Sequence, residues 1–206
     1  MPALGNTDVD FVNRALIMLG EEKINSLTDE DDNSVICATI YEAVRDEVLG
    51  KYPWRCLLKK GQLAQLVTAP INEWSYAYQL PSDRVGEIRT VFNSSEIGAK
   101  PFKDYEILGN QLLTDAEEVW VEYPYLINES DFPAHIRTLI VFVLAARLAE
   151  PITEDSSKGD KWEQRAYGSA GEDGMGGYFA RARLVDSAQR PSQELSGEYE
   201  LVSVRS

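Results

Sequence analysis

The sequence predicts an α+β protein in which a bundle of about four helices carries an inserted antiparallel β region. Two observations support this class: apolar residues recur at helical spacing towards both ends of the chain, and they alternate at strand spacing in the middle. A length of 206 residues suffices for one large domain or two small ones. We expect one domain over residues 1–189, with helices at about 8–19, 34–50, 131–149 and 154–188, a β region at about 57–126, and an extended C-terminal tail at 190–206.

The first helix carries both a start signal and a stop signal. Thr7 and Asp10 have the spacing of a capping box, in which each residue satisfies a backbone N–H group of the other. Gly20 can adopt the left-handed conformation that commonly ends a helix. The acidic link that follows lies near the start of the second helix, where the helix dipole favours negative charge.

The stretch from Ile36 to Trp54 is the segment around which the rest of the chain is arranged. It reads as an amphipathic helix that Pro53 prevents from continuing. Tyr52 and Trp54 lie at its exit, where they are expected to fix the helix end to the β region. We interpret Tyr41, Pro53 and Trp54 as a structural junction. The buried face of this helix is expected to hold Cys37, Tyr41, Val44 and Val48.

Alternating residues between the helical segments predict short strands. Residues 74–80 form the clearest strand, with Trp74 at its start. Residues 85–92 are apolar on both faces, which is typical of a central strand. Gly109-Asn110 predicts the turn of a hairpin. Pro124 should either close the last strand or put that strand at a sheet edge.

The third helix is expected to start at Asp131, with Pro133 in its first turn, and to end at Pro151. Its segment 139–146 is apolar on every side and must therefore be buried by other helices or by other subunits. Five glycines between 168 and 177 interrupt the last helical stretch. They predict two helical pieces with a flexible or kinked join, or a place where another chain approaches closely.

The composition limits the classes of partner. The formal net charge is −14, from 34 acids against 20 bases, so the chain is not expected to wrap nucleic acid through its phosphates. Such charge could line a passage through which DNA slides, or it could simply keep the protein soluble. We expect no signal peptide and no membrane span, because the most apolar run has eight residues against the roughly 20 needed to cross a bilayer.

Searches for catalytic or metal-binding patterns are negative. His135 is the only histidine, so no Ser-His-Asp or Cys-His arrangement can be built without it, and we interpret it as a packing or surface residue. Asp29 and Asp31 begin like a calcium loop, but Ser34 and Ile40 occupy the positions that need glycine and glutamate. The two cysteines form no disulfide framework. We expect no catalytic residue, no metal and no cofactor.

Acidic residues between Asp104 and Asp131 are the one candidate for chemistry, because no Lys or Arg falls among them. A glycoside hydrolase needs two carboxylates in different environments. A tail-associated hydrolase that degrades the cell envelope is therefore the alternative function, although a run of acids is more often a solvated face. The candidates are Asp115, Glu117, Glu118, Glu122 and Glu129.

Five segments in order carry a family resemblance across roughly residues 8–189. They are ALIMLGEEKINSL, IYEAVRDEVLGKYPW, EWSYAYQLPSD, YEILGNQLLTDAEEVWVEYPY and the apolar helix ending in LAARLAEPIT. Together they resemble the tail tubular protein A family, the head-to-tail adaptors of short-tailed bacteriophages. The glycine-rich part of the last helix departs from the family pattern, which is more continuously helical.

The resemblance implies a structural virion protein rather than an enzyme. It implies a homo-oligomeric ring of twelve copies docked beneath the portal protein, extending the DNA channel and presenting a platform to the next tail component, a nozzle or tail tube protein. The protein would reside in the virion neck, and in the host cytoplasm during assembly. An assembly factor of prophage origin is a further reading. The β-prone end of the tail could add a strand to a partner, through Tyr199, Leu201, Val202 and Val204.

Overall fold

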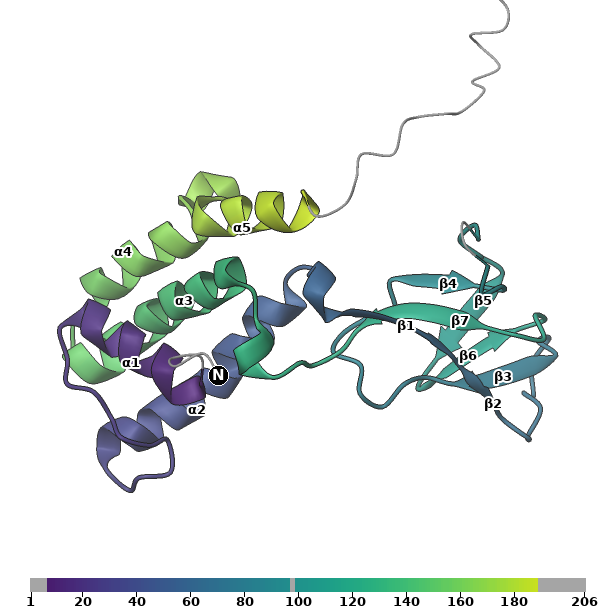
Figure 1. Ribbon diagram of the computed structural model, residues 1–206, viewed down its shortest axis with the longest axis horizontal. Helices are drawn as coiled ribbons and strands as arrows, with labels where there is room; N and C mark the ends of the chain where they lie inside the picture. Colours follow the sequence, from purple (N-terminus) through teal and green to yellow (C-terminus); the bar gives the residue numbers. More distant parts are fainter. Residues whose placement is uncertain (1–6, 97–98, 189–206) are drawn as a thin grey trace, which may run out of the picture.

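The computed structural model describes residues 7–96 and 99–188 and confirms the α+β class. Helices gather in one lobe and strands in a second lobe that projects from it (Figure 1). All seven strands come between the second and third helices in the chain. The described residues contain five α-helices where the sequence predicts about four, because the last predicted helix is two separate helices.

The first two helices begin at side-chain caps. In α1, Asp8–Leu19, the Thr7 N–H donates to an Asp10 carboxylate oxygen at 3.0 Å, and the Asp10 N–H donates to Thr7 Oγ1 at 3.3 Å. Helix α2, Asp32–Gly50, starts two residues earlier than expected because the Asp31 carboxylate accepts the Ser34 N–H at 3.1 Å. Asp31, which belongs to the rejected calcium-loop pattern, therefore serves as a helix cap.

Helix α3, Ala134–Thr153, lies at the centre of the helical lobe and packs against the other four helices. Its apolar segment 139–146 is thereby covered by helices of the same chain. Phe142 is half-buried and packs on Trp162 and Tyr178. Of the two predicted coverings, other helices and other subunits, the structure shows the first. Because four helices of the same chain cover this segment, α3 provides no argument for other subunits.

Both ends of α3 differ from the prediction. The helix starts at Ala134 rather than Asp131, because Pro133 is its N-cap and residues 129–131 form a separate 3₁₀ turn. It continues through Pro151 to Thr153, where the Thr153 hydroxyl donates to the Ala149 carbonyl at 2.7 Å. Proline removes one N–H donor but is tolerated here, within one turn of the helix end.

The glycine-rich segment forms an ordered turn between α4, Ser156–Tyr167, and α5, Gly177–Ser187. The predicted two helical pieces with a kinked join are confirmed. The Gly176 N–H donates to the Tyr167 carbonyl at 2.9 Å, which folds α5 back onto α4. Gly168 and Gly177 have φ of 88° and 55°, so here the glycines permit a close approach between two parts of the same chain.

Gly177→Ala is expected to lower the free energy of unfolding by about 2 kcal/mol, because it combines a left-handed backbone with a steric clash. A Cβ added there would lie 2.6 Å from the Gly168 backbone nitrogen. Gly171→Ala is the matched control, since a Cβ there meets nothing within 4 Å and the backbone is not left-handed. Urea denaturation of both variants checks this, and equal stabilities would contradict it.

The β lobe is built from two antiparallel sheets. The first has the order β1-β7-β4, from Leu58–Gln62, Trp120–Pro124 and Thr90–Phe92. The second has the order β2-β3-β6-β5, from Ala64–Gln65, Tyr76–Gln79, Gln111–Thr114 and Tyr105–Leu108. The lobe has its own hydrophobic core, separate from that of the helices, formed by Leu63, Tyr78, Leu80, Val91, Leu112, Val119, Val121 and Tyr123.

The hairpin prediction is confirmed, because Gly109 with φ of 61° joins β5 to β6. Two strand predictions need correction. The strand expected at 74–80 begins at Tyr76, since the Asp115 carboxylate accepts the Ser75 N–H at 2.8 Å. The segment 85–92 contributes only β4, which lies at a sheet edge, and β7 is the central strand. Pro124 closes β7, the first of its two predicted roles.

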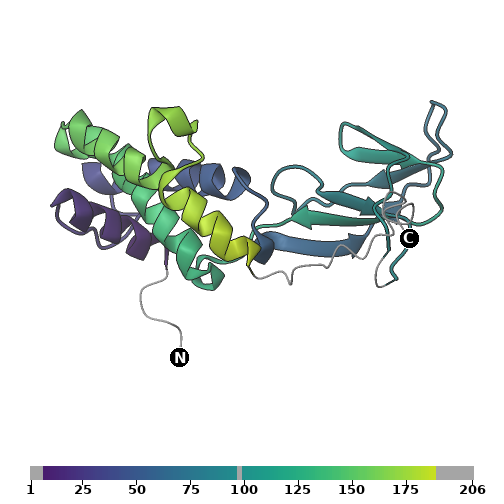
Figure 2. The ribbon, with the colours of Figure 1, turned by 90° about the horizontal axis from the view of Figure 1, so that it is seen from above.

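Two neighbouring strands join the lobes. β1 leaves the helical lobe after the 3₁₀ turn at Arg55–Leu57, and β7 returns beside it, with Leu58 opposite Pro124. The β lobe therefore extends from the helical lobe on an antiparallel pair of strands (Figure 2). Only the segments next to this pair, around Trp54 and Tyr125, connect the two lobes through the backbone.

Candidate functional site

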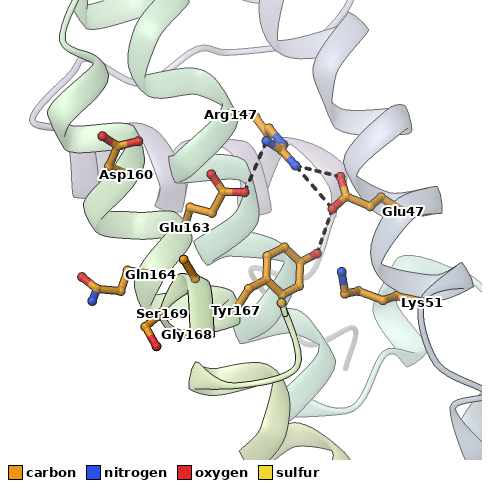
Figure 3. Close-up of a pocket in the computed structure, with 11 residues that line it drawn as sticks. Glu47, Lys51, Arg147, Asp160, Glu163, Gln164, Tyr167, Gly168 and Ser169 are labelled. Carbon is orange, nitrogen blue, oxygen red and sulfur yellow. Dashed lines mark hydrogen bonds and ion pairs between the residues drawn. The ribbon is translucent and has the colours of Figure 1, made fainter. Parts of the chain in front are cut away.

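A polar hollow of about 520 Å³ lies between α2, α3 and α4 (Figure 3). Arg147 from α3 points into it and forms ion pairs with Glu47 of α2 at 3.4 Å and Glu163 of α4 at 3.7 Å. The Tyr167 hydroxyl donates to Glu47 at 3.1 Å, and the Lys51 ammonium lies 4.3 Å from the centre of the Tyr167 ring. These contacts connect three helices through one network.

The arrangement is suited to holding helices together rather than to proton transfer. Burial, reinforced by the charge of Glu47, raises the pKa of Tyr167, so its hydroxyl stays protonated and donates. The guanidinium of Arg147 is shared between two carboxylates from different helices. Within the described part of the chain, no three His, Cys, Asp or Glu side chains come together as a metal site.

The two cysteines are poor nucleophiles. Burial raises the pKa of Cys37 to about 11, with a smaller effect from the charge of Asp31. Burial likewise raises the pKa of Cys56 to about 11, aided by the charge of Asp186. Since the thiolate is the reactive form, both remain protonated near neutral pH. Cys37 is fully buried on the apolar face of α2, as predicted.

A buried polar cluster lies where α5 meets the junction between the lobes. The Asp186 carboxylate accepts the Arg55 backbone N–H at 3.1 and 3.3 Å, and His135 Nε2 lies 3.8 Å away. The side chains of Asp186 and His135 are 1% and 7% exposed. The interpretation of His135 as a packing residue agrees with its position against Trp54, with ring centroids 5.9 Å apart.

Trp54 is the centre of an aromatic cluster at this junction. It is fully buried, and its indole N–H donates to the Val48 carbonyl at 2.9 Å, which closes the turn after α2. Its ring packs against Tyr52 at 4.9 Å and Phe179 at 5.9 Å. Of the other predicted junction residues, Pro53 lies within this turn. Tyr41 lies earlier on α2, stacked on Phe11.

Titration of His135 is expected to make stability depend on pH below about 6.5, the ordinary pKa of histidine. Burial lowers the pKa of His135 from its ordinary value of 6.5, and the charge of Asp186 opposes this only in part. The unfolded chain therefore binds a proton more readily, so stability is full above pH 6.5 and falls as pH decreases. His135→Leu should flatten this dependence in urea denaturation, and an unchanged slope would contradict it.

The acidic residues considered for catalysis lie in three places in the structure. Glu122 on β7 pairs with Arg89 at 3.1 Å, and Glu129 pairs with Arg45 of α2 at 3.6 Å. Asp115 accepts a backbone N–H, and Glu117 and Glu118 are exposed on the same turn. None of the five lines the hollow in Figure 3.

Two exposed apolar surfaces were not anticipated from the sequence. The first is at the end of the β lobe, where Val67 and Ile71 are fully exposed and Leu108 is 62% exposed. The second is the outer face of α5, where Leu184 is 70% and Val185 51% exposed. The spacing of Arg181, Leu184, Val185 and Ala188 was a usable signal for the second surface, because residues at that spacing share one helix face.

The predicted partner-binding residues Tyr199, Leu201, Val202 and Val204 lie outside the described residues, as does the whole 190–206 tail. Among the helices of residues 7–96 and 99–188, none has both the length and the apolar character needed to cross a membrane.

Comparison of the chain with protein-family models gave no match, and a search of curated proteins gave no significant match.

Proposed function

We propose that this protein is a head-to-tail adaptor of a short-tailed bacteriophage, a structural component without catalytic activity. Twelve copies form a ring beneath the portal protein, extend the DNA channel and join the capsid vertex to the nozzle or tail tube. The helices act as one bundle, with the β region as an insertion and the C-terminal tail as a separate attachment. The protein resides in the virion neck and, during assembly, in the host cytoplasm.

The observation that best supports this proposal is the division into two lobes with separate cores. A connector must contact one partner on each side, and two independently packed lobes provide two surfaces at a set separation. The antiparallel pair β1 and β7 holds the β lobe away from the helices. The aromatic and polar contacts of Trp54 and Asp186 fix the base of that pair.

The charge of the chain is compatible with a channel wall. The net charge of −14 disfavours phosphate binding and would let DNA pass without specific contacts. The paired state of Glu47, Glu122, Glu129 and Glu163 gives these acids a structural role in the fold. Envelope hydrolysis, the alternative function, has less support, because none of the candidate carboxylates lines the polar hollow and two of them are held in ion pairs.

Removal of residues 190–206 is expected to abolish binding to the portal protein encoded in the same genome, while α5 and the two lobes stay folded. The reason is that the tail carries an apolar, β-prone end that could add a strand to a partner. Co-sedimentation with purified portal rings measures this. A variant with serine at Tyr199, Leu201, Val202 and Val204 should lose binding as well.

The matched control replaces Ser192 and Ser196 of the same tail with alanine and should bind normally. Circular dichroism of each variant separates loss of binding from loss of fold. Undiminished portal binding by the truncated chain would contradict the assignment of the tail as an attachment segment.

A further inference from the structure

We propose that the outer face of α5 in one copy docks into the apolar hollow at the end of the β lobe of the next copy. The hollow, here called the tip hollow, is lined by residues 66–72 and by Gln79, Leu108, Gln111 and Leu113. This contact rests on the proposed adaptor function, because that function requires the copies to close into a ring. It specifies which two surfaces of the chain meet.

The tip hollow has the properties of a docking surface. It encloses about 740 Å³, and its lining contains no charged side chain. Val67 and Ile71 line the tip hollow and are fully exposed. Clusters of exposed large apolar side chains are uncommon on protein surfaces and often mark interaction sites. Burial of such a surface against apolar side chains would be favourable, because it removes apolar area from water.

The outer face of α5 is complementary to the tip hollow in chemistry. Arg181, Leu184, Val185 and Ala188 follow the spacing by which an amphipathic helix presents anchors to a groove. All four side chains are exposed, and the only acid of this helix, Asp186, is buried on the opposite side. The helix thus presents basic and apolar groups together on one face of an acidic chain.

Charge complementarity identifies a second copy as the occupant. Glu73 is exposed two residues after Ile71, and Glu106 is exposed on the same face of β5 as Leu108. Glu73 follows the lining residue Asn72, and Glu106 pairs opposite the lining residue Leu113, so both acids are next to lining residues of the tip hollow, while the α5 face carries Arg181. The pairing avoids the like-charge repulsion that a chain of net charge −14 would otherwise impose on self-association.

The two surfaces lie on different lobes, so the contact is heterologous. Helix α5 lies on the helical lobe, whereas the loop 66–75 lies at the far end of the β lobe (Figure 2). A surface of one copy that meets a different surface of the next generates a closed ring when the rotation between copies allows it. A contact between identical surfaces would stop at a dimer.

The test is a pair of cysteine substitutions in the full-length chain. A mixture of the Leu184→Cys and Ile71→Cys variants is expected to form an intermolecular disulfide on mild oxidation. The disulfide is expected both in the protein by itself at high concentration and in the protein assembled on portal rings. The native cysteines do not interfere, because both are at least half-buried with raised pKa values. Absence of this cross-link in both settings would overturn the proposal.

Single charged substitutions give the quantitative test. Leu184→Asp and Ile71→Asp should each weaken self-association about tenfold or more in sedimentation velocity. Val35→Asp is the matched control, since Val35 is 53% exposed on α2 and belongs to neither surface. Equal effects of all three would overturn the pairing. Arg181→Glu should also weaken association, and Glu73→Arg in the mixing partner should restore it.

The outcomes separate this inference from the proposed function. A cross-link of Ile71→Cys with itself would show that two tip hollows pair, which contradicts docking by α5. Portal binding without the Leu184–Ile71 cross-link would leave the adaptor function standing and remove only this contact. Efficient cross-linking without portal binding would support the contact and argue against the adaptor function.

Discussion

Trp54→Ala is expected to lower the free energy of unfolding by about 3–5 kcal/mol, the cost of truncating a large buried aromatic side chain. The indole is fully buried, packs on Tyr52, Phe179 and His135, and donates to the Val48 carbonyl. Its removal leaves a cavity where α2, α3 and α5 meet the junction. Urea denaturation followed by circular dichroism measures the loss.

Because Trp54 belongs to the core of the helical lobe, that lobe should lose stability while the β lobe keeps its own. Trp74→Ala is the matched control, since this tryptophan is half-buried at the edge of the β lobe and bonds only to the exposed Glu106. Trp74→Ala should lower the free energy of unfolding by about 1 kcal/mol or less. If Trp54→Ala unfolded like the unsubstituted chain, the junction would not be the organising element of this fold.

Asp186→Ala is expected to lower the free energy of unfolding by about 3 kcal/mol, because the Arg55 backbone N–H group loses a charged acceptor. The Arg55 N–H donates to both carboxylate oxygens of Asp186, and this contact attaches α5 to the base of the β lobe. Loosening it should also free the end of α5, from which the C-terminal tail continues. Hydrogen exchange at the Arg55 amide should rise together with the loss of stability.

Asp186→Asn provides the control, because its amide oxygen can still accept the Arg55 N–H. We expect it to lose clearly less stability than the alanine variant. Equal losses in both variants would mean that charge, rather than the hydrogen bond, holds α5 in place. No loss in either would contradict the role of this contact.

Several local features of the fold could be predicted from the sequence, because they depend on neighbouring residues. The capping box of Thr7 and Asp10, the left-handed Gly20 and the Gly109 hairpin each depend on residues three or fewer positions apart. The glycines from 168 to 177 likewise predicted a break between two helices. Each of these signals acts through backbone conformation, which neighbouring residues determine.

Other features depend on contacts between distant residues, and the sequence does not indicate which residues meet. Asp186 and Arg55 are 131 positions apart, and Arg147 and Glu47 are 100 apart. Both pairs could only be found from the folded chain. The same limitation explains why the sequence left open what covers α3, because the four helices packed against it come from different parts of the chain. The strand at 74–80 was overestimated because Asp115, distant in sequence, ends its pairing.

Electron microscopy of the full-length chain mixed with its portal protein tests the adaptor assignment most directly. The proposal predicts a ring of twelve copies on one face of the portal, coaxial with its channel, with the helical lobe and the β lobe resolved in each copy. Rings that fail to form, or chains attached without rotational symmetry about the channel, would contradict the assignment.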